Sequence, residues 1–398
     1  MSRPSRPSRP RVVFIVQRCA DDAYGGAERL CLETARHMSR HWDLEILTTC
    51  AQDVRTWANV YPEGTAQVEG VTVRRFRVAR EREPARFDRL SARLAAQLPN
   101  DPAREREWME AQGPLAPALR DYVVANRARF DACYVYSYLY ATTYFSLPEF
   151  NDDTVLVPLA HDEWPLRMGI WDVFFRQPRT IVCVSAEERR LLQRRFRDLP
   201  NLGPVIPAGV EAPAAIDAAS FRARYCGGRD YLLYLGRVEA AKGCDELLDD
   251  YLALPAALRE QLPLVLAGPI ALAIPNDPTV IAVGPLEETM KWSALAGCEA
   301  LVVPSRFESL SLVALEAWAA GRPVLASGRS PVLIGQCRRS GGGLWYANRD
   351  EFLALVSGKL FGVADALGAQ GRRYVAAEHR WEAIEAAHLS LIGAMLDP

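Results

Sequence analysis

The stretch YLLYLGRVEAAKGCDELLDDYL at residues 231–252 points to the fold of the chain. Its first five residues are large and apolar, as in a buried strand, and a glycine-containing loop follows over 236–243. From residue 244 the apolar positions recur at helical spacing. A strand, a loop and a helix in this order form a βα unit, the repeating element of parallel α/β sheets. The sequence therefore predicts an α/β protein.

The same alternation continues on both sides of this stretch. In the second half it predicts a helix from about 310 to 320 and strands at 262–267, 300–303 and 322–326. In the first half it predicts a helix at 27–39 and strands at 11–16, 44–48, 132–136, 155–159 and 180–184. Residues 81–110 are charged with few apolar positions, so we expect exposed helices on an insertion there.

A cluster of proline and glycine at 199–213, LPNLGPVIPAGVEAP, separates two α/β halves. We expect a disordered tail over 1–10, where MSRPSRPSRP has too little apolar surface to offset the entropy of ordering. A first domain over 11–205 and a second from 206 follow, each a Rossmann-like doubly wound sheet, facing one another across a cleft. Ligands of such sheets bind beyond the carboxyl ends of the strands, so the cleft is the expected site.

The composition excludes several classes of protein. With 398 residues, 49% of them apolar, and a net charge of −2, the chain is expected to be globular and not to bind nucleic acid. Its nine cysteines are an odd number without a C-x-x-C pair, which favours reduced thiols in the cytoplasm over disulfides or structural zinc. No apolar run approaches the ~18 residues of a membrane span, and the basic start lacks the apolar segment of a signal peptide.

Common catalytic motifs are also absent from the sequence. Without G-x-G-x-x-G or G-x-x-x-x-G-K-S/T, a nicotinamide enzyme and a P-loop NTPase are disfavoured. The lack of D-x-D leaves a metal-bridged diphosphate site without obvious ligands, and G-x-S-x-G is missing as well. We therefore expect neither a metal ion nor a cofactor.

Two cations follow the strand at 231–235. Gly236 and Arg237 begin the loop and Lys242 stands near its end, one of only three lysines in the chain. Fixed positive charges beside the amides of a helix N-terminus favour a diphosphate group. The alternative is that both cations are ordinary solvated loop residues.

A second constellation reads ESLSLVALE, with Glu308 and Glu316 at its ends. The amides near Leu310, Ser311 and Leu312 begin a helix and are suited to phosphate oxygens. Glu316, which this reading places some two turns into the helix, suits the hydroxyls of a ribose, and Glu308 suits a sugar hydroxyl better than a phosphate. The alternative is an ordinary glutamate favoured by the helix dipole.

The first half contributes two weaker features. His161, in AHDE, follows the strand at 155–159, where a side chain can touch substrate, although a loop histidine of this kind is often only structural. Gly25 and Gly26 lie in the first strand-to-helix turn, where glycine allows the backbone to approach a ligand closely, although glycine is common in such turns.

In order and spacing, the segments along the chain resemble a family 4 glycosyltransferase of the two-Rossmann-domain (GT-B) type. The most specific are LGRVEAAKGCDELL, VVPSRFESLSLVALEAWAAGRPVLAS and GGGLWY in the second half. The first half adds GGAERLCLETARHMSRHWDLEILTT, AHDEWPL and TIVCVSAEERRLL, and VIPAGVEAP resembles the family's linker. The resemblance implies a second domain over 206–380 and a last helix over 381–398 that crosses back to the first domain.

The resemblance implies retaining, metal-independent transfer of a sugar, expected to be a hexose, from a nucleotide-diphosphate sugar as co-substrate. Arg237 and Lys242 would hold the diphosphate and stabilise the leaving group. Glu316 would bind the ribose and Glu308 the transferred sugar. Gly26 would let the first loop close on the phosphates, and His161 would lie near the reacting carbon or a sugar hydroxyl. No nucleophile stands out, which fits a front-face mechanism in which the leaving phosphate helps to deprotonate the acceptor.

Two departures from the family pattern bear on the donor. The pattern E-S-F-G is replaced by Glu308-Ser309-Leu310-Ser311, which we expect to narrow the phosphate pocket, and the linker asparagine is replaced by Ala208.

The acceptor is not determined by the sequence. A saccharide or a lipid-linked acceptor in bacterial surface-polysaccharide synthesis is expected by analogy with the family, and a small metabolite stays open. Five arginines on one predicted helix suggest contact with an anionic membrane surface, or else a solvated face: Arg189, Arg190, Arg194, Arg195 and Arg197. Competing functions are a nucleotide-sugar 2-epimerase and a non-catalytic subunit of a polysaccharide assembly.

Overall fold

The computed structural model describes residues 9–20, 25–360 and 362–396, and it divides the chain into two compact units. Unit 1 comprises residues 1–207 and 385–398, and unit 2 comprises residues 208–384. The division after Pro207 lies two residues beyond the expected boundary, and unit 2 ends at Ile384 instead of residue 380. Within the expected tail, residues 1–8 lie outside the described residues.

The described part of the expected tail is bound to unit 1. The guanidinium of Arg9 donates to the carbonyls of Ser39 and Trp42, and the Pro10 carbonyl accepts from the Asp43 amide. Ser39 is the C-cap of the helix Gly26–Met38, so its carbonyl is a favourable place for a cation. The expectation of disorder is therefore wrong for Arg9 and Pro10.

Unit 1 contains an eight-stranded sheet in the order β3-β4-β2-β1-β5-β6-β7-β8. The strands are β1 (Arg11–Ile15), β2 (Asp43–Thr49), β3 (Gly64–Val68), β4 (Val71–Phe76), β5 (Ala132–Tyr136), β6 (Thr154–Val157), β7 (Thr180–Cys183) and β8 (Leu202–Val205). All neighbours pair in parallel except β3 and β4, which form an antiparallel pair at the edge. Its helices include α1 (Gly26–Met38), α2 (Pro84–Ala96), α3 (Pro102–Gln112), α4 (Pro117–Asn126), α5 (Ala141–Ser146), α6 (Trp171–Phe174) and α7 (Ala186–Arg195).

Unit 2 contains a six-stranded parallel sheet in the order β11-β10-β9-β12-β13-β14. The strands are β9 (Leu232–Leu235), β10 (Leu264–Ala267), β11 (Val280–Gly284), β12 (Ala300–Val303), β13 (Val324–Ser327) and β14 (Gly343–Tyr346). The helices are α8 (Ala218–Cys226), α9 (Cys244–Leu252), α10 (Ala256–Gln261), α11 (Glu288–Gly297), α12 (Leu312–Ala319), α13 (Pro331–Ser340), α14 (Arg349–Ala354), α15 (Ala364–Glu378) and the first residues of α16 (Trp381–Leu396).

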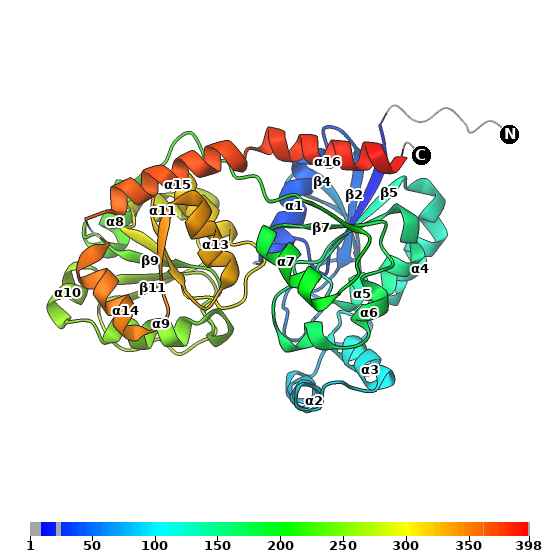
Figure 1. The fold of residues 1–398 in the computed structure, drawn as a ribbon, viewed down its shortest axis with the longest axis horizontal. Helices are drawn as coiled ribbons and strands as arrows, with labels where there is room; N and C mark the ends of the chain where they lie inside the picture. The colour runs from blue at the N-terminus through cyan, green and yellow to red at the C-terminus, as the bar shows by residue number, and fades with distance from the viewer. Residues whose placement is uncertain (1–8, 21–24, 361, 397–398) are drawn as a thin grey trace. The chain divides into compact units, whose positions relative to one another are not determined.

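The sheet of unit 2 is covered by helices on both faces (Figure 1). Leu233 of β9 packs with α8, α11, α12, α13 and α15, whereas Leu232 and Tyr234 pack with α9 and α14. Successive side chains of a strand point to opposite faces, so a strand that is apolar at every position is buried on both sides. The run YLLYL therefore produces the doubly wound α/β fold, and this part of the prediction is confirmed.

The segment 81–110 forms helices with mostly exposed side chains, as expected, but several of its residues are buried in unit 1. It forms the helices α2 and α3, but Leu94, Trp108 and Met109 are buried in the core of unit 1. Glu105 is fully buried too, and its carboxylate accepts from the amides of Gly169 (3.1 Å) and Ile170 (2.8 Å). The few apolar residues of this segment lie on the face that packs inward, so the helices are part of the unit and not a free insertion.

From Glu385 onward, α16 belongs to unit 1. Glu385 lies 2.9 Å from His37 Nδ1 and 3.0 Å from His41 Nε2, at the end of α1 and just beyond it. His388 Nδ1 lies 3.1 Å from the hydroxyl of Tyr134 on β5. No helix among the described residues is both long enough and apolar enough to cross a membrane.

Candidate functional site

The loops after β9 and β12 lie at the topological switch point of unit 2. From β9 the chain proceeds to β10 and β11 on one side of the sheet, and it returns to β12 on the other side of β9. Because these strands are parallel, the loops 236–243 and 304–311 leave the sheet at the same edge. In doubly wound sheets this position forms the ligand crevice.

Glycine allows these two loops to pack closely. Gly243 has φ +76°, and a Cβ atom there would lie 2.7 Å from the carbonyl oxygen of Pro304. Gly236, at the end of β9, has φ +142°. Both conformations are unfavourable for other residues, so the sequence G-R-x5-G is needed for the path of this loop.

The two predicted cations each lie against a carboxylate. The guanidinium of Arg237 is 3.1 Å from Glu239, and its backbone carbonyl accepts from the Tyr234 hydroxyl at 2.6 Å. Lys242 Nζ donates to Glu308 Oε1 at 3.0 Å, so the structure brings together two of the predicted site residues from different loops. Both cationic side chains are about one-third exposed, at 34% and 32%, and are therefore accessible to a ligand.

The amino end of α12 carries no capping side chain. The helix begins at Leu312, and Ser311 occupies the N-cap position, where its side chain accepts no capping hydrogen bond. The Ser311 hydroxyl is buried and has no partner among the described residues. The first amides of a helix lack intrahelical partners, so this end is suited to an anion.

This start corrects the expected position of Glu316. We expected the helix to begin near residue 310 with Glu316 two turns in, but Leu310 and Ser311 precede the helix. Glu316 is the fifth helical residue, little more than one turn from the amino end.

Lys291 of α11 is a site residue that the sequence analysis missed. Its Nζ donates to Glu316 Oε1 at 2.8 Å and lies 2.9 Å from Glu288 Oε1. Burial lowers the pKa of Lys291, but the charges of Glu316 and Glu288 outweigh it, so the net shift is upward. The scarcity of lysine was the signal that could have identified it, since Lys242 and Lys291 are two of three lysines.

The remaining predicted residues belong to unit 1. Gly25 precedes α1, and a Cβ atom there would lie 2.1 Å from Glu28 Oε2, whose carboxylate is held by the guanidinium of Arg18. Gly26 has open space beside it. The loop residues 21–24 lie outside the described residues. Packing thus explains Gly25 and leaves Gly26 without a structural requirement.

His161 follows β6, as predicted, and its Nδ1 lies 3.3 Å from Glu163 Oε1. The loop before it is fixed by a residue that the sequence analysis missed. Glu188 is buried and accepts from the amides of Ala160 at 2.6 Å and Val184 at 2.7 Å, thereby joining the ends of β6 and β7. Burial raises the pKa of Glu188 to about 7. A capping box, Ser185-x-x-Glu188, was the available signal.

The five arginines at and near α7 differ in the groups that they contact, although we expected them to share one helix face. Arg195 donates to the carbonyls of Leu166 (2.8 Å) and Met168 (3.0 Å) and pairs with Asp172, so it is turned toward the protein. Arg190 pairs with Glu187, and Arg197 lies beyond the end of the helix. The five arginines therefore do not form one exposed basic face.

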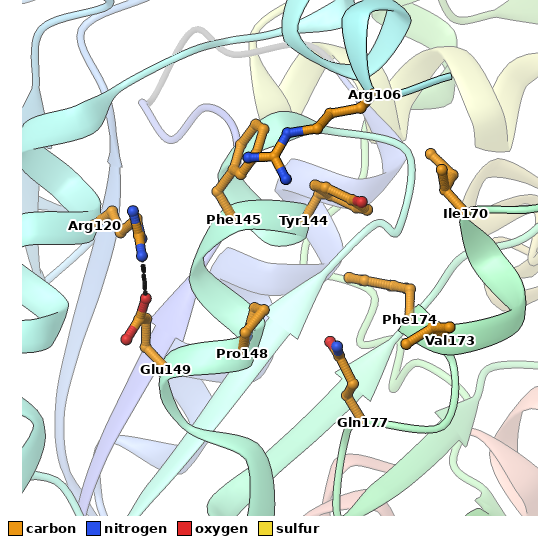
Figure 2. A pocket seen from close by; sticks show the side chains of 10 residues that line it. All are labelled: Arg106, Arg120, Tyr144, Phe145, Pro148, Glu149, Ile170, Val173, Phe174 and Gln177. Carbon is orange, nitrogen blue, oxygen red and sulfur yellow. Dashed lines mark hydrogen bonds and ion pairs between the residues drawn. The ribbon is translucent and has the colours of Figure 1, made fainter. Parts of the chain in front are cut away.

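A separate cavity of about 280 Å³ lies in unit 1 (Figure 2). It is lined by Arg106, Arg120, Tyr144, Phe145, Pro148, Glu149, Ile170, Val173, Phe174 and Gln177. Arg120 points to Glu149 and pairs with it at 2.7 Å, as the figure shows. None of the predicted site residues lines this cavity. Among the described residues, no cluster of histidine, cysteine, aspartate or glutamate is arranged to hold a metal ion.

The sequence and the fold were then compared with known proteins. Residues 229–357 match the family described as Glycosyl transferases group 1. A curated relative is the D-inositol 3-phosphate glycosyltransferase of Geodermatophilus obscurus, 30% identical over 168 residues. That alignment covers 37% of this chain and 37% of the relative, so the match spans little more than a third of the relative's length.

Solved structures resemble the chain over nearly its whole length. Sucrose-phosphate synthase from Thermosynechococcus elongatus has a TM-score of 0.68 at 18% identity, covering 97% of this chain and 99% of its own. HepE from Anabaena, in complex with UDP and glucose, has a TM-score of 0.69 at 14% identity, covering 97% of this chain and 100% of its own. These likenesses establish the GT-B fold, with two Rossmann-like domains, and residues 229–357 match the model of the Glycosyl transferases group 1 family.

Proposed function

We propose that the protein is a glycosyltransferase that moves a sugar from a nucleoside-diphosphate donor to an acceptor. The observation that carries the proposal is the uncapped amino end of α12 at the switch point of unit 2, with Lys242 on the neighbouring loop. A diphosphate is the anion that such a helix end and a mobile cation hold well. The match of residues 229–357 to the Glycosyl transferases group 1 family, and the UDP and glucose in the HepE complex, support this ligand class.

In this proposal Lys242 exchanges Glu308 for the diphosphate. The ammonium group of Lys242 and the guanidinium of Arg237 then stabilise the negative charge that develops on the leaving diphosphate. Glu308, released from its ion pair, accepts a hydrogen bond from a hydroxyl of the transferred sugar. Glu316 accepts from the ribose. For the predicted residues of unit 1, the proposal is that Gly26, which has open space beside it, gives the phosphates room, and that His161 contacts a sugar hydroxyl.

The proposed chemistry is a retaining transfer without metal or cofactor. The bond between the anomeric carbon and the diphosphate oxygen breaks, and the bond to the acceptor oxygen forms on the same face of the sugar. The acceptor hydroxyl gives its proton to the leaving phosphate oxygen. Preorganised cations provide the main stabilisation in such a step.

For the acceptor, we propose a saccharide or a lipid-linked saccharide used in surface-polysaccharide synthesis, with the enzyme in the cytoplasm and at the membrane surface. A second candidate is a small metabolite, which the name of the curated relative, a D-inositol 3-phosphate glycosyltransferase, favours. Co-sedimentation with anionic and neutral vesicles at two salt concentrations separates these proposals. Salt-sensitive binding to anionic vesicles supports the membrane, and no binding to either vesicle supports the soluble metabolite.

Thermal-shift titration with UDP, GDP, dTDP and ADP, with and without EDTA, tests the proposed donor. A ligand that binds only the folded state raises the melting temperature by mass action. Selective stabilisation by one base, unaffected by EDTA, is the expected result and identifies the donor class. If none of the four shifts the melting temperature of folded protein, the donor site is refuted and a non-catalytic subunit is favoured. Sugar analysis without acceptor tests the epimerase alternative.

A further inference from the structure

Lys291 connects two helices of unit 2 through a nearly buried ion pair. Its ammonium group contacts Glu316 of α12 at 2.8 Å and Glu288 of its own helix at 2.9 Å. The side chains of Lys291 and Glu316 are only 16% and 15% exposed. Glu288 is also held by the indole of Trp292 at 2.9 Å. The position of the ammonium group is therefore defined by groups on both helices.

The two carboxylate oxygens of Glu316 differ in their hydrogen bonding. Oε1 accepts from Lys291, whereas no hydrogen bond among the described residues uses Oε2. Oε2 is not one of the fully buried oxygens that lack a hydrogen-bond partner, so it is accessible. A carboxylate that is held through one oxygen keeps the other as an acceptor of fixed direction.

A charge argument explains why this carboxylate needs a cation. Glu316 lies little more than one turn from the amino end of α12, where the proposed diphosphate binds. Two anions brought close together in a partly buried site repel one another, and an unpaired buried carboxylate is costly. Lys291 neutralises Glu316 and so lets it remain ionised beside the diphosphate.

We propose that Lys291 is a positioning residue that makes the site specific for ribonucleotides. It orients Glu316 so that Oε2 accepts from a ribose hydroxyl, and it thereby disfavours 2′-deoxyribonucleotides. This inference rests on the proposed function, since it assumes that a nucleoside diphosphate binds at α12. It concerns the sugar of the nucleotide, independently of the base and of the transferred sugar.

Calorimetric titration with matched nucleotides tests the proposal. UDP, GDP and ADP are each compared with their 2′-deoxy forms, and the ratio of the two Kd values is the readout. In the wild type we expect the ribonucleotide of the preferred base to bind about tenfold more tightly or better, the effect of one hydrogen bond to a charged group. Lys291→Met should reduce this ratio to nearly one.

Two further variants test whether a change in the ratio of the two Kd values is specific to Lys291. Lys242→Met removes a diphosphate contact, so it should weaken both nucleotides and leave their ratio unchanged. Lys291→Arg keeps the charge and should retain a ratio between those of the wild type and Lys291→Met, since a guanidinium does not reproduce the position of the compact ammonium. Should Lys291→Met fail to fold, Lys291→Gln, which is polar and of similar length, is measured in its place.

The outcomes distinguish this inference from the proposed function. Equal affinity of the wild type for both sugars, or an unchanged ratio in the folded Lys291 variants, overturns the inference while the donor site stands. If the wild type binds none of the six nucleotides, the donor site itself is refuted and the inference with it.

Discussion

Replacing Lys242 with alanine separates the catalytic from the structural contribution of this residue. The Lys242–Glu308 pair is 3.0 Å long, and the lysine side chain is about one-third exposed. An ion pair of this exposure contributes at most about 1 kcal/mol to folding, so the melting temperature should fall by no more than about 2–4 °C. The same ammonium acting on a leaving diphosphate contributes about 3–4 kcal/mol to the transition state, which corresponds to a 10²–10³-fold loss of turnover.

The assay follows the release of nucleoside diphosphate from the donor, with the Kd for the nucleoside diphosphate and the melting temperature measured in parallel. Arg349→Met is the matched control, because Arg349 makes a similar ion pair with Asp250 at 2.8 Å and lies on α14, away from the two site loops in sequence. The control should keep its turnover. Wild-type turnover and nucleotide affinity in Lys242→Ala would refute the reasoning.

Three other predictions concern the loops and the buried groups. Gly243→Ala should weaken nucleoside-diphosphate binding and lower the melting temperature, because the position has φ +76° and a Cβ atom there would lie 2.7 Å from Pro304. Gly227→Ala is the control, since with φ +60° and open space it introduces only the backbone strain of about 1–2 kcal/mol. Equal nucleotide Kd values in the two variants would contradict a role for the contact between the loops. Glu188→Gln should destabilise the fold by about 1–3 kcal/mol and reduce turnover, with the nucleoside-diphosphate Kd unchanged. The reason is that one amide oxygen cannot replace the two carboxylate oxygens that accept from Ala160 and Val184. Full turnover in the folded variant would exclude an effect through His161. Burial lowers the pKa of His388 to about 4, so below about pH 6.5 the unfolded chain binds a proton that the folded chain does not. The free energy of unfolding should therefore drop by about 2 kcal/mol from pH 7 to pH 5. Urea unfolding should show a smaller drop in His388→Phe, and an identical drop in this variant would contradict the assignment.

The strands that were predictable are those in which most residues of the segment are apolar. RVVFI, ACYVY and ALVV became β1, β5 and β12 because a strand covered on both faces needs no polar side. β4, VTVRRF, was not predicted since it carries two arginines. In the structure Arg74 lies over the ring of Tyr122, and Arg75 donates to the Cys19 carbonyl. These partners are distant in sequence, so local pattern could not reveal them.

The candidate site likewise contains residues that the local sequence predicts and residues that it does not. Arg237, Lys242 and the start of α12 follow from the order of strand, loop and helix, which is local information. Lys291 and Glu188 do not, because each acts through a group that the fold alone brings near. Lys291 meets Glu316 across two helices, and Glu188 reaches from α7 to the end of β6. The scarcity of lysine and the capping box Ser185-x-x-Glu188 mark these two residues as unusual, but neither signal shows which distant group the residue holds.

The pairing of the site cations has a consequence for ligand selection. Without donor, Lys242 holds Glu308 and Arg237 holds Glu239, so no cation of this group is left without a carboxylate. A ligand must therefore replace an existing attraction instead of filling an empty one. At an effective dielectric constant near 20, the gross Coulomb attraction of one pair of unit charges at 4 Å is about 4 kcal/mol, most of which is offset by desolvation and screening. A ligand with one charge therefore gains little by exchange with a carboxylate. A diphosphate carries two or more charges and, in the proposed site, also accepts from the amides of α12, whereas the hydrogen bond recorded for Glu308 among the described residues is to Lys242. The arrangement thus keeps the loops folded in the absence of donor and favours ligands with more than one phosphate over a lone carboxylate or monophosphate.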